Sequence, residues 1–125
     1  MPRSWASFQP FSLPVIALRV GGTIVRGLVD TGVSQSLIDH RLVKQLSLRE
    51  EESSWVVGIA TGPLQVNLVS INDAVIGRCP LKSFRAGIMD LTNLRIGVQL
   101  ILGIDAFRGY RLQFDLAKGQ FYLLA

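Results

Sequence analysis

The chain has 125 residues, of which 49% are hydrophobic and 18% are charged, and its net charge is +4 at neutral pH. This balance excludes extensive disorder, and the length suits a single domain. One cysteine and one histidine exclude an internal disulfide framework and a histidine-rich metal cage, so we expect neither a metal nor a cofactor.

The amino-acid composition of the chain changes near Leu13. Prolines and serines interrupt residues 1–12, which are expected to form a flexible arm, and residues 13–125 are expected to form the folded domain. Residues 14–20 and 23–29 are rich in β-branched side chains and predict two strands, joined by a tight glycine turn.

The middle of the chain contains the one convincing helix. Asp39 is a suitable N-cap for a short helix over 40–46, whose apolar residues recur at helical spacing. The acidic run at 50–52 and the two serines after it are expected to form an exposed loop.

The rest of the chain alternates apolar segments with turn residues. A helical turn is expected at 104–108, and the C-terminal residues 121–124 are apolar and are expected to need a partner chain. Further strands are expected at 55–59, 64–71, 74–76, 81–88, 98–102, 110–116 and 120–124. The pattern predicts a mainly all-β fold, a closed or nearly closed barrel of short strands.

Two short segments stand out as candidates for a catalytic site. Leu28-Val29-Asp30-Thr31-Gly32 is an apolar strand that runs into Asp-Thr-Gly, and Leu100-Ile101-Leu102-Gly103 is a later apolar strand that ends in glycine. A carboxylate at the end of a buried strand is held in place and partly desolvated. Gly32 allows a sharp turn and brings a backbone N–H close to that carboxylate.

With a glycine-tipped hairpin between them, these segments resemble the retropepsins, the single-domain aspartic proteases of retroviruses, retrotransposons and, as stand-alone forms, bacteria and eukaryotes. The resemblance covers nearly the whole chain, from about Leu13 to Leu124. It implies an acid-protease barrel with one short α-helix and a β-hairpin flap. The implied function is an aspartic endopeptidase, which hydrolyses peptide bonds with a water activated by two aspartates.

The resemblance also implies a role for each part of the motif. Asp30 is the catalytic residue, and because the chain has only one Asp-Thr-Gly, the active form is a homodimer with one Asp30 from each subunit. The active-site loop continues with Thr31, Gly32 and Val33. The substrate-binding flap comprises Val57, Gly58, Ile59, Ala60, Thr61 and Gly62. The segment that supports the active site comprises Ile101, Leu102 and Gly103.

Three residues need a separate interpretation. Val33 stands where the family usually has alanine or serine, and it leaves open the alternative of a catalytically weak or inactive module that dimerises or binds peptides. Ile104 replaces the arginine of retroviral members. Asp105 is interpreted as a structural hydrogen-bond acceptor or helix cap. The alternative for the hairpin is an ordinary β-hairpin with no gating role.

The expected partners are a second copy of the chain and a peptide or protein substrate. Lysines and arginines are scattered singly, which indicates a solvated basic surface, so we expect no nucleic acid partner. No apolar run approaches membrane-spanning length, so we expect no membrane span in this chain and a soluble, cytoplasmic protein.

Overall fold

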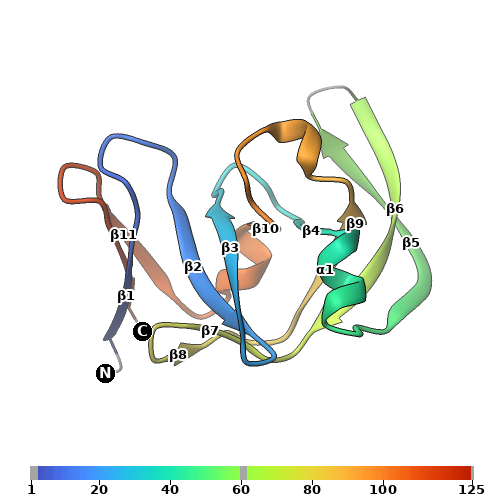
Figure 1. Cartoon of the computed structure of the whole chain (residues 1–125), viewed down its shortest axis with the longest axis horizontal. Helices are drawn as coiled ribbons and strands as arrows, with labels where there is room; N and C mark the ends of the chain where they lie inside the picture. The colour runs from blue at the N-terminus through green and yellow to red at the C-terminus, as the bar shows by residue number, and fades with distance from the viewer. Residues whose placement is uncertain (1–2, 60–61, 125) are drawn as a thin grey trace.

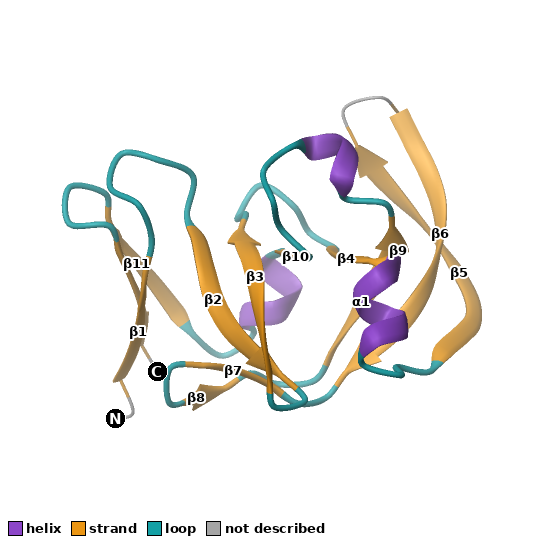
Figure 2. Cartoon of the chain, in the orientation of Figure 1, coloured by secondary structure: helices purple, strands orange, loops and turns teal. Residues whose placement is uncertain are grey.

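Strands dominate the computed structural model of this chain, which describes residues 3–59 and 62–124 (Figure 2). The strands are β1 (Arg3–Ser7), β2 (Val15–Val20), β3 (Thr23–Val29), β4 (Ser36–Asp39), β5 (Glu50–Ile59), β6 (Gly62–Ile71), β7 (Ala74–Ile76), β8 (Cys79–Pro80), β9 (Phe84–Met89), β10 (Leu100–Leu102), β11 (Arg111–Asp115) and β12 (Gln120–Leu124). The helical elements are α1 (His40–Gln45) and the 3-10 turns η1 (Thr92–Leu94) and η2 (Ile104–Phe107). The mainly β architecture with one short α-helix is confirmed.

The strands form two sheets, which Figure 1 shows as a curled sheet with a small sheet at one side. The large sheet has the order β5-β6-β9-β4-β10-β3-β2-β7-β8, and the small one has the order β1-β12-β11. At the centre of the large sheet, β10 runs parallel to β3 and antiparallel to β4. This pairing sets Ile101 opposite Leu28 and Leu102 opposite Val29, so the two motif-bearing segments are neighbours.

The central strands are buried on both faces. Leu100 and Leu102 are fully buried in the larger apolar cluster, which also contains Phe121 and Leu123. Ile101 points to the other face, into a second cluster that holds Leu28, Leu37, Leu91 and Val98. Burial on both faces explains why β10 reads as a continuous apolar run and not as an alternating one.

Helix α1 forms where the Asp39 cap and the apolar spacing of the sequence predict it. Asp39 caps it by accepting a hydrogen bond from the Arg41 backbone N–H at 2.9 Å, and Leu42 and Val43 are its buried residues. The cap and the apolar spacing predicted from the sequence are confirmed, and the helix ends at Gln45, one residue earlier than expected.

The N-terminal segment differs from the expected flexible arm. Arg3–Ser7 forms β1, which pairs antiparallel with β12. The buried Ser4 hydroxyl donates to the Ile76 carbonyl at 2.7 Å and accepts from the Arg78 N–H at 2.8 Å. The serine that suggested a loop is therefore a bridge between β1 and the β7–β8 turn.

Alternate side chains of the apolar C-terminal segment are covered by their own chain, so Phe121 and Leu123 need no partner for their burial, whereas Tyr122 and Leu124 are half-buried. β12 is the middle strand of the small sheet, and Phe121 and Leu123 have no exposed surface. The Phe121 ring lies 5.8 Å from the Phe107 ring and 5.1 Å from the Phe114 ring, centroid to centroid.

The acidic run is also not a loop. Glu50 and Glu51 open β5 and pair with Val69 and Leu68 of β6. The Glu50 carboxylate accepts from the Asn67 amide at 2.5 Å, which places polar side chains together on a sheet surface.

Candidate active site

Asp30 lies at the end of β3, where the buried strand reaches the surface. Its backbone N–H donates to the Leu102 carbonyl at 2.9 Å, which extends the β3–β10 contact beyond the last strand residue. Its Oδ1 atom accepts from the Gly32 N–H at 3.0 Å, and the side chain is partly exposed. The carboxylate is thus held by its own loop while one side stays open to solvent.

The loop after Asp30 is tied to the segment after β10. The Val33 N–H donates to the Asp30 carbonyl at 3.3 Å, and the Val33 carbonyl accepts from the Ile104 N–H at 2.9 Å. Gly103 lies so close that a Cβ on it would be 2.5 Å from the Val33 oxygen. The structure therefore brings together Asp30, Val33, Leu102 and Gly103, which the sequence had singled out in two separate segments.

Behind this contact lies a pair of polar residues. The Ser36 hydroxyl donates to Asp105 Oδ1 at 2.7 Å and accepts from the Gly103 N–H at 3.0 Å. The Ser36 N–H also donates to the same carboxylate, at 3.0 Å to Oδ1 and 3.2 Å to Oδ2. Asp105 is thus a structural acceptor, as expected, whereas Ser36 was missed because a serine at the start of a strand carries no distinctive signal.

The expected hairpin is present in the backbone. β5 and β6 are antiparallel, with Gly58 opposite Pro63 and Ile59 opposite Gly62. Ala60 and Thr61, placed in the flap by the sequence, lie outside the described residues. In Figure 1 the arrowhead of β5, the start of β6 and the loop that follows β3 all lie towards the upper side of the molecule.

Two other carboxylates of the chain, Asp39 and Asp90, have partners of their own. Asp39 caps α1 and forms an ion pair with Arg41 at 3.2 Å. The pKa of Asp90 is lowered to about 2 by hydrogen bonds from the hydroxyl and N–H of Thr92, with Arg41 adding to the effect. Within the ranges 3–59 and 62–124, no group of three or more His, Cys, Asp or Glu residues is arranged to hold a metal ion.

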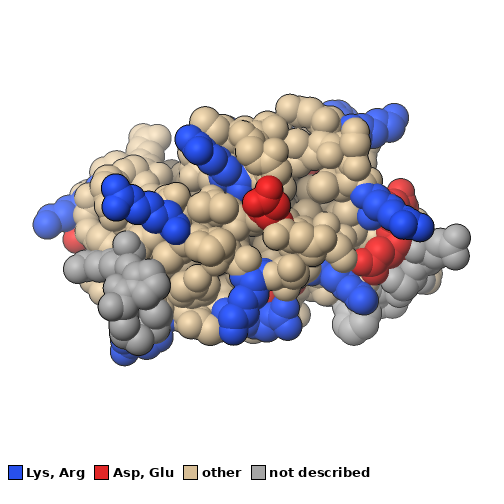
Figure 3. Space-filling view, turned by 90° about the horizontal axis from the view of Figure 1, so that it is seen from below, with Lys and Arg blue, Asp and Glu red and all other residues tan. Residues whose placement is uncertain are grey.

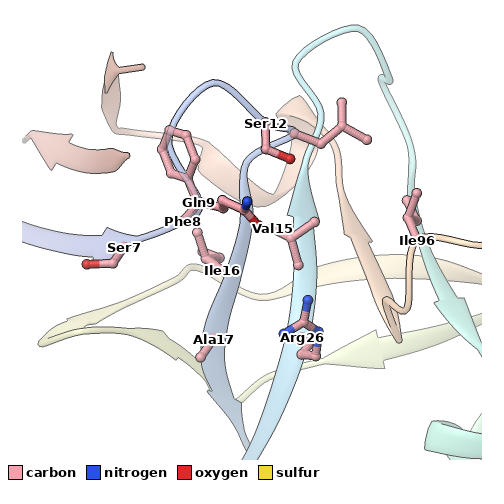
Figure 4. A pocket seen from close by; sticks show the side chains of 10 residues that line it. Ser7, Phe8, Gln9, Ser12, Val15, Ile16, Ala17, Arg26 and Ile96 are labelled. Carbon is pink, nitrogen blue, oxygen red and sulfur yellow. The ribbon is translucent and has the colours of Figure 1, made fainter. Parts of the chain in front are cut away.

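The structure has two cavities whose lining residues do not include Asp30. The larger, of about 570 Å³, lies beside β2 and has Val15, Arg26 and Ile96 in its walls but no carboxylate (Figure 4). A second, of about 330 Å³, is lined by Asp105 and Arg108 among others.

The surface charge does not form a stripe on the face shown in Figure 3. Basic side chains are spread across that face, with acidic groups near some of them. Such an arrangement differs from the clustered basic surfaces of nucleic-acid-binding domains. In the part of the chain that the structure describes, no helix is both long and apolar enough to cross a bilayer.

Comparisons with known proteins agree on one family. A family model described as aspartyl protease matches residues 16–106, a span that includes the Asp30 loop and Gly103. The structure is similar to a retropepsin-like aspartic protease from Rickettsia conorii, with a TM-score of 0.66 and 15% identity over 98% of this chain and 90% of that one. It is also similar to the retroviral protease-like domain of Ddi1 from Leishmania major, with a TM-score of 0.55 and 16% identity over 84% of this chain and 82% of that one.

At these identities the structural likeness demonstrates a shared fold, and no match was found among curated proteins. The family model, by contrast, covers most of the chain. The chain therefore belongs to the aspartyl protease family and has a retropepsin-like fold.

Proposed function

We propose that this protein is a homodimeric aspartic endopeptidase, in which Asp30 from each of two chains activates the water that cleaves a peptide bond. The observation that carries the proposal is the setting of Asp30. It follows a buried strand, its loop is bonded to β10, and its carboxylate remains partly exposed.

The chemistry needs two carboxylates on one water. One carboxylate takes a proton from the water, whose oxygen attacks the carbonyl carbon, while the protonated partner polarises the carbonyl oxygen. The tetrahedral intermediate then collapses, the C–N bond breaks, and the amine nitrogen leaves with a proton. Two carboxyl groups held close together favour sharing one proton, so an acid and a base are present at once.

A second chain is the natural source of the second carboxylate. Asp39, Asp90 and Asp105 are bonded to partners of their own and are not part of the Asp30 loop. A two-fold axis beside the loop brings Asp30 against its symmetry mate. Thr31 and Gly32 are exposed there, and Ile104, bonded to the loop through its N–H, has 53% of its surface exposed.

The hairpin of β5 and β6 is the element that would cover the substrate. An extended peptide binds by backbone pairing with strand-like segments, and a hairpin that closes over it excludes water. Nothing specific favours the inactive module, because the Val33 contacts that hold the loop use backbone atoms only, which alanine or serine would use in the same way.

The test compares the wild-type chain with Asp30→Asn. We expect the wild type to sediment as a dimer and to cleave peptides from a mixed library, as read by mass spectrometry, with inhibition by a statine-type compound. Asp30→Asn should keep its fold and lose cleavage. Asp73→Asn changes an exposed aspartate in the β6–β7 turn and serves as the matched control that keeps full activity.

Each contrary result has a definite meaning. A monomer that cleaves peptides would refute the shared pair of aspartates. A dimer that cleaves no peptide in the library would support the binding or dimerisation module instead.

A further inference from the structure

We propose that Asp105 and Ser36 are a positioning pair that holds the Asp30 loop in its reactive geometry, an inference that rests on the proposed peptidase function. Neither residue is assigned a proton transfer. Their role is to fix Gly103 and Val33, and through them Asp30.

The pair is held by directional hydrogen bonds. Ser36 has no exposed surface, and its N–H and hydroxyl both donate to the Asp105 carboxylate, the hydroxyl at 2.7 Å. An ionised carboxylate only accepts, so the single hydroxyl hydrogen must point to Asp105. The oxygen lone pairs of Ser36 are then left for the Gly103 N–H at 3.0 Å.

The bonds continue from Gly103 to the aspartate. Gly103 lies against the Val33 carbonyl, which accepts from the neighbouring Ile104 N–H at 2.9 Å. The Val33 N–H in turn donates to the Asp30 carbonyl. One connected path of hydrogen bonds and backbone contact therefore leads from the Asp105 carboxylate to the backbone of Asp30.

The direction of the bonds explains why these residue types are needed. Ser36 must donate and accept at once, which alanine cannot do and threonine can. Removing the hydroxyl leaves the Gly103 N–H without a partner in a buried site, which is costly enough to shift the local backbone. A shift of about 1 Å in a reacting group can lower a rate by about 100-fold.

The experiment measures kcat and KM for Ser36→Ala, Asp105→Ala and the double variant. Active sites are counted by titration with an inhibitor, and every variant is assayed below its own unfolding temperature. We expect each single variant to lose about 10- to 100-fold in kcat while KM changes by less than about 3-fold. Because both residues act through one path, the double variant should lose little more than either single variant. Ser36→Thr should restore most of kcat.

Ser4→Ala is the matched control. The Ser4 hydroxyl also donates to a backbone carbonyl and accepts from a backbone N–H while buried, but it joins β1 to the β7–β8 turn. We expect it to lower the unfolding temperature comparably and to leave kcat unchanged. A kcat per active site that is also unchanged in Ser36→Ala and Asp105→Ala would overturn the proposal and leave these residues with a role in stability alone.

A second measurement does not depend on catalysis. Amide hydrogen exchange at Asp30 and Ile104 should rise by at least about 10-fold in Ser36→Ala and Asp105→Ala and remain at the wild-type rate in Ser4→Ala. If the wild type cleaves nothing, the proposed function fails, while the exchange rates still decide whether the pair holds the loop. Unchanged exchange at both amides would overturn the pairing whatever the activity.

Discussion

Replacing Gly103 with alanine measures how closely the Asp30 loop lies against the segment after β10. Gly103 has φ −83° and ψ −178°, an extended conformation open to any residue, so it is required only for space. A Cβ there would meet the Val33 oxygen at 2.5 Å, the Val33 carbonyl carbon at 3.2 Å and Asp105 Oδ1 at 3.0 Å. Two of these three atoms are backbone and cannot rotate away.

The cost can be worked from these contacts. Overpacking in a well-packed region costs about 1–3 kcal/mol. Moving the Val33 carbonyl also weakens its bond with the Ile104 N–H, worth about 0.5–1.5 kcal/mol. We therefore expect Gly103→Ala to lower the free energy of unfolding by about 2–4 kcal/mol. For a chain of this length, that corresponds to a fall of about 6–20 °C in Tm.

The assay is thermal unfolding followed by circular dichroism, with peptide cleavage measured on the same samples. Gly32→Ala is the contrasting variant, because its Cβ would meet only Asp30 Oδ1, at 3.3 Å, on a side chain that can move. We expect its Tm to stay within about 2 °C of wild type, since surface substitutions change stability by about 0.5 kcal/mol, while cleavage falls because the carboxylate is displaced. A Tm for Gly103→Ala within 2 °C of wild type would refute the close approach on which this reasoning depends.

Three further predictions concern the rest of the chain. Phe121→Ala should lower the free energy of unfolding by about 3–5 kcal/mol in urea denaturation, because the ring is fully buried, and a smaller loss than about 1 kcal/mol would contradict that burial. Deleting residues 121–125 should give an unfolded chain by circular dichroism and not a folded monomer, because it removes the middle strand of the small sheet. Asp90→Asn should lower Tm at neutral pH. Since the pKa of Asp90 is lowered from 3.8 to about 2, this stabilisation is complete above pH 3.8 and is lost as the pH falls through about 2, where the wild-type and variant Tm values should converge.

Much of the fold could be predicted because its signals are local. The Gly21–Gly22 turn joins β2 and β3 as expected, with Gly21 at φ 58° and Gly22 at φ 82°. The Asp39 cap, the spacing of Leu42 and the apolar run of β10 likewise depend on neighbours within a few residues.

The predictions that proved wrong concern segments whose structure is determined by residues far away in the sequence. β1 contains Ser4 and lies close to prolines, and it becomes a strand because β12 pairs with it. The apolar residues of β12 read as an unpaired end, because nothing local reveals that Phe107 and Phe114 cover Phe121. Glu50 and Glu51 read as a loop, because charge is typical of loops, and only pairing with β6 makes them strand residues.

The candidate site divides in the same way. Asp30 and Gly103 were found because each ends a recognisable apolar segment, and the parallel pairing of β3 with β10 places them together. Ser36 was not found, since its importance depends on a hydroxyl that bridges Asp105 and Gly103 across the fold. A short polar residue with two bonded partners is visible only when the partners' positions are known.

Asp30 is fixed on the side that faces its own chain and open on the other, and this asymmetry permits a decisive mixing test. The Asp30 N–H and carbonyl are both bonded to the chain, to Leu102 and Val33, whereas Thr31 and Gly32 are exposed. In the proposed dimer, the partner chain would supply the second carboxyl group, while the order of the loop comes from its own chain. If both Asp30 carboxyls are required, wild-type chains mixed equally with Asp30→Asn and allowed to exchange should retain about a quarter of the activity of the same total chain concentration, because only the wild-type pairs are active. Retention of about half, if each Asp30 acts independently, or of about three quarters, if one Asp30 per dimer gives full activity, would mean that a single Asp30 is enough, with full exchange verified by mass spectrometry of differently labelled chains. Either result would exclude the shared pair of aspartates even if the protein proved to be a peptidase.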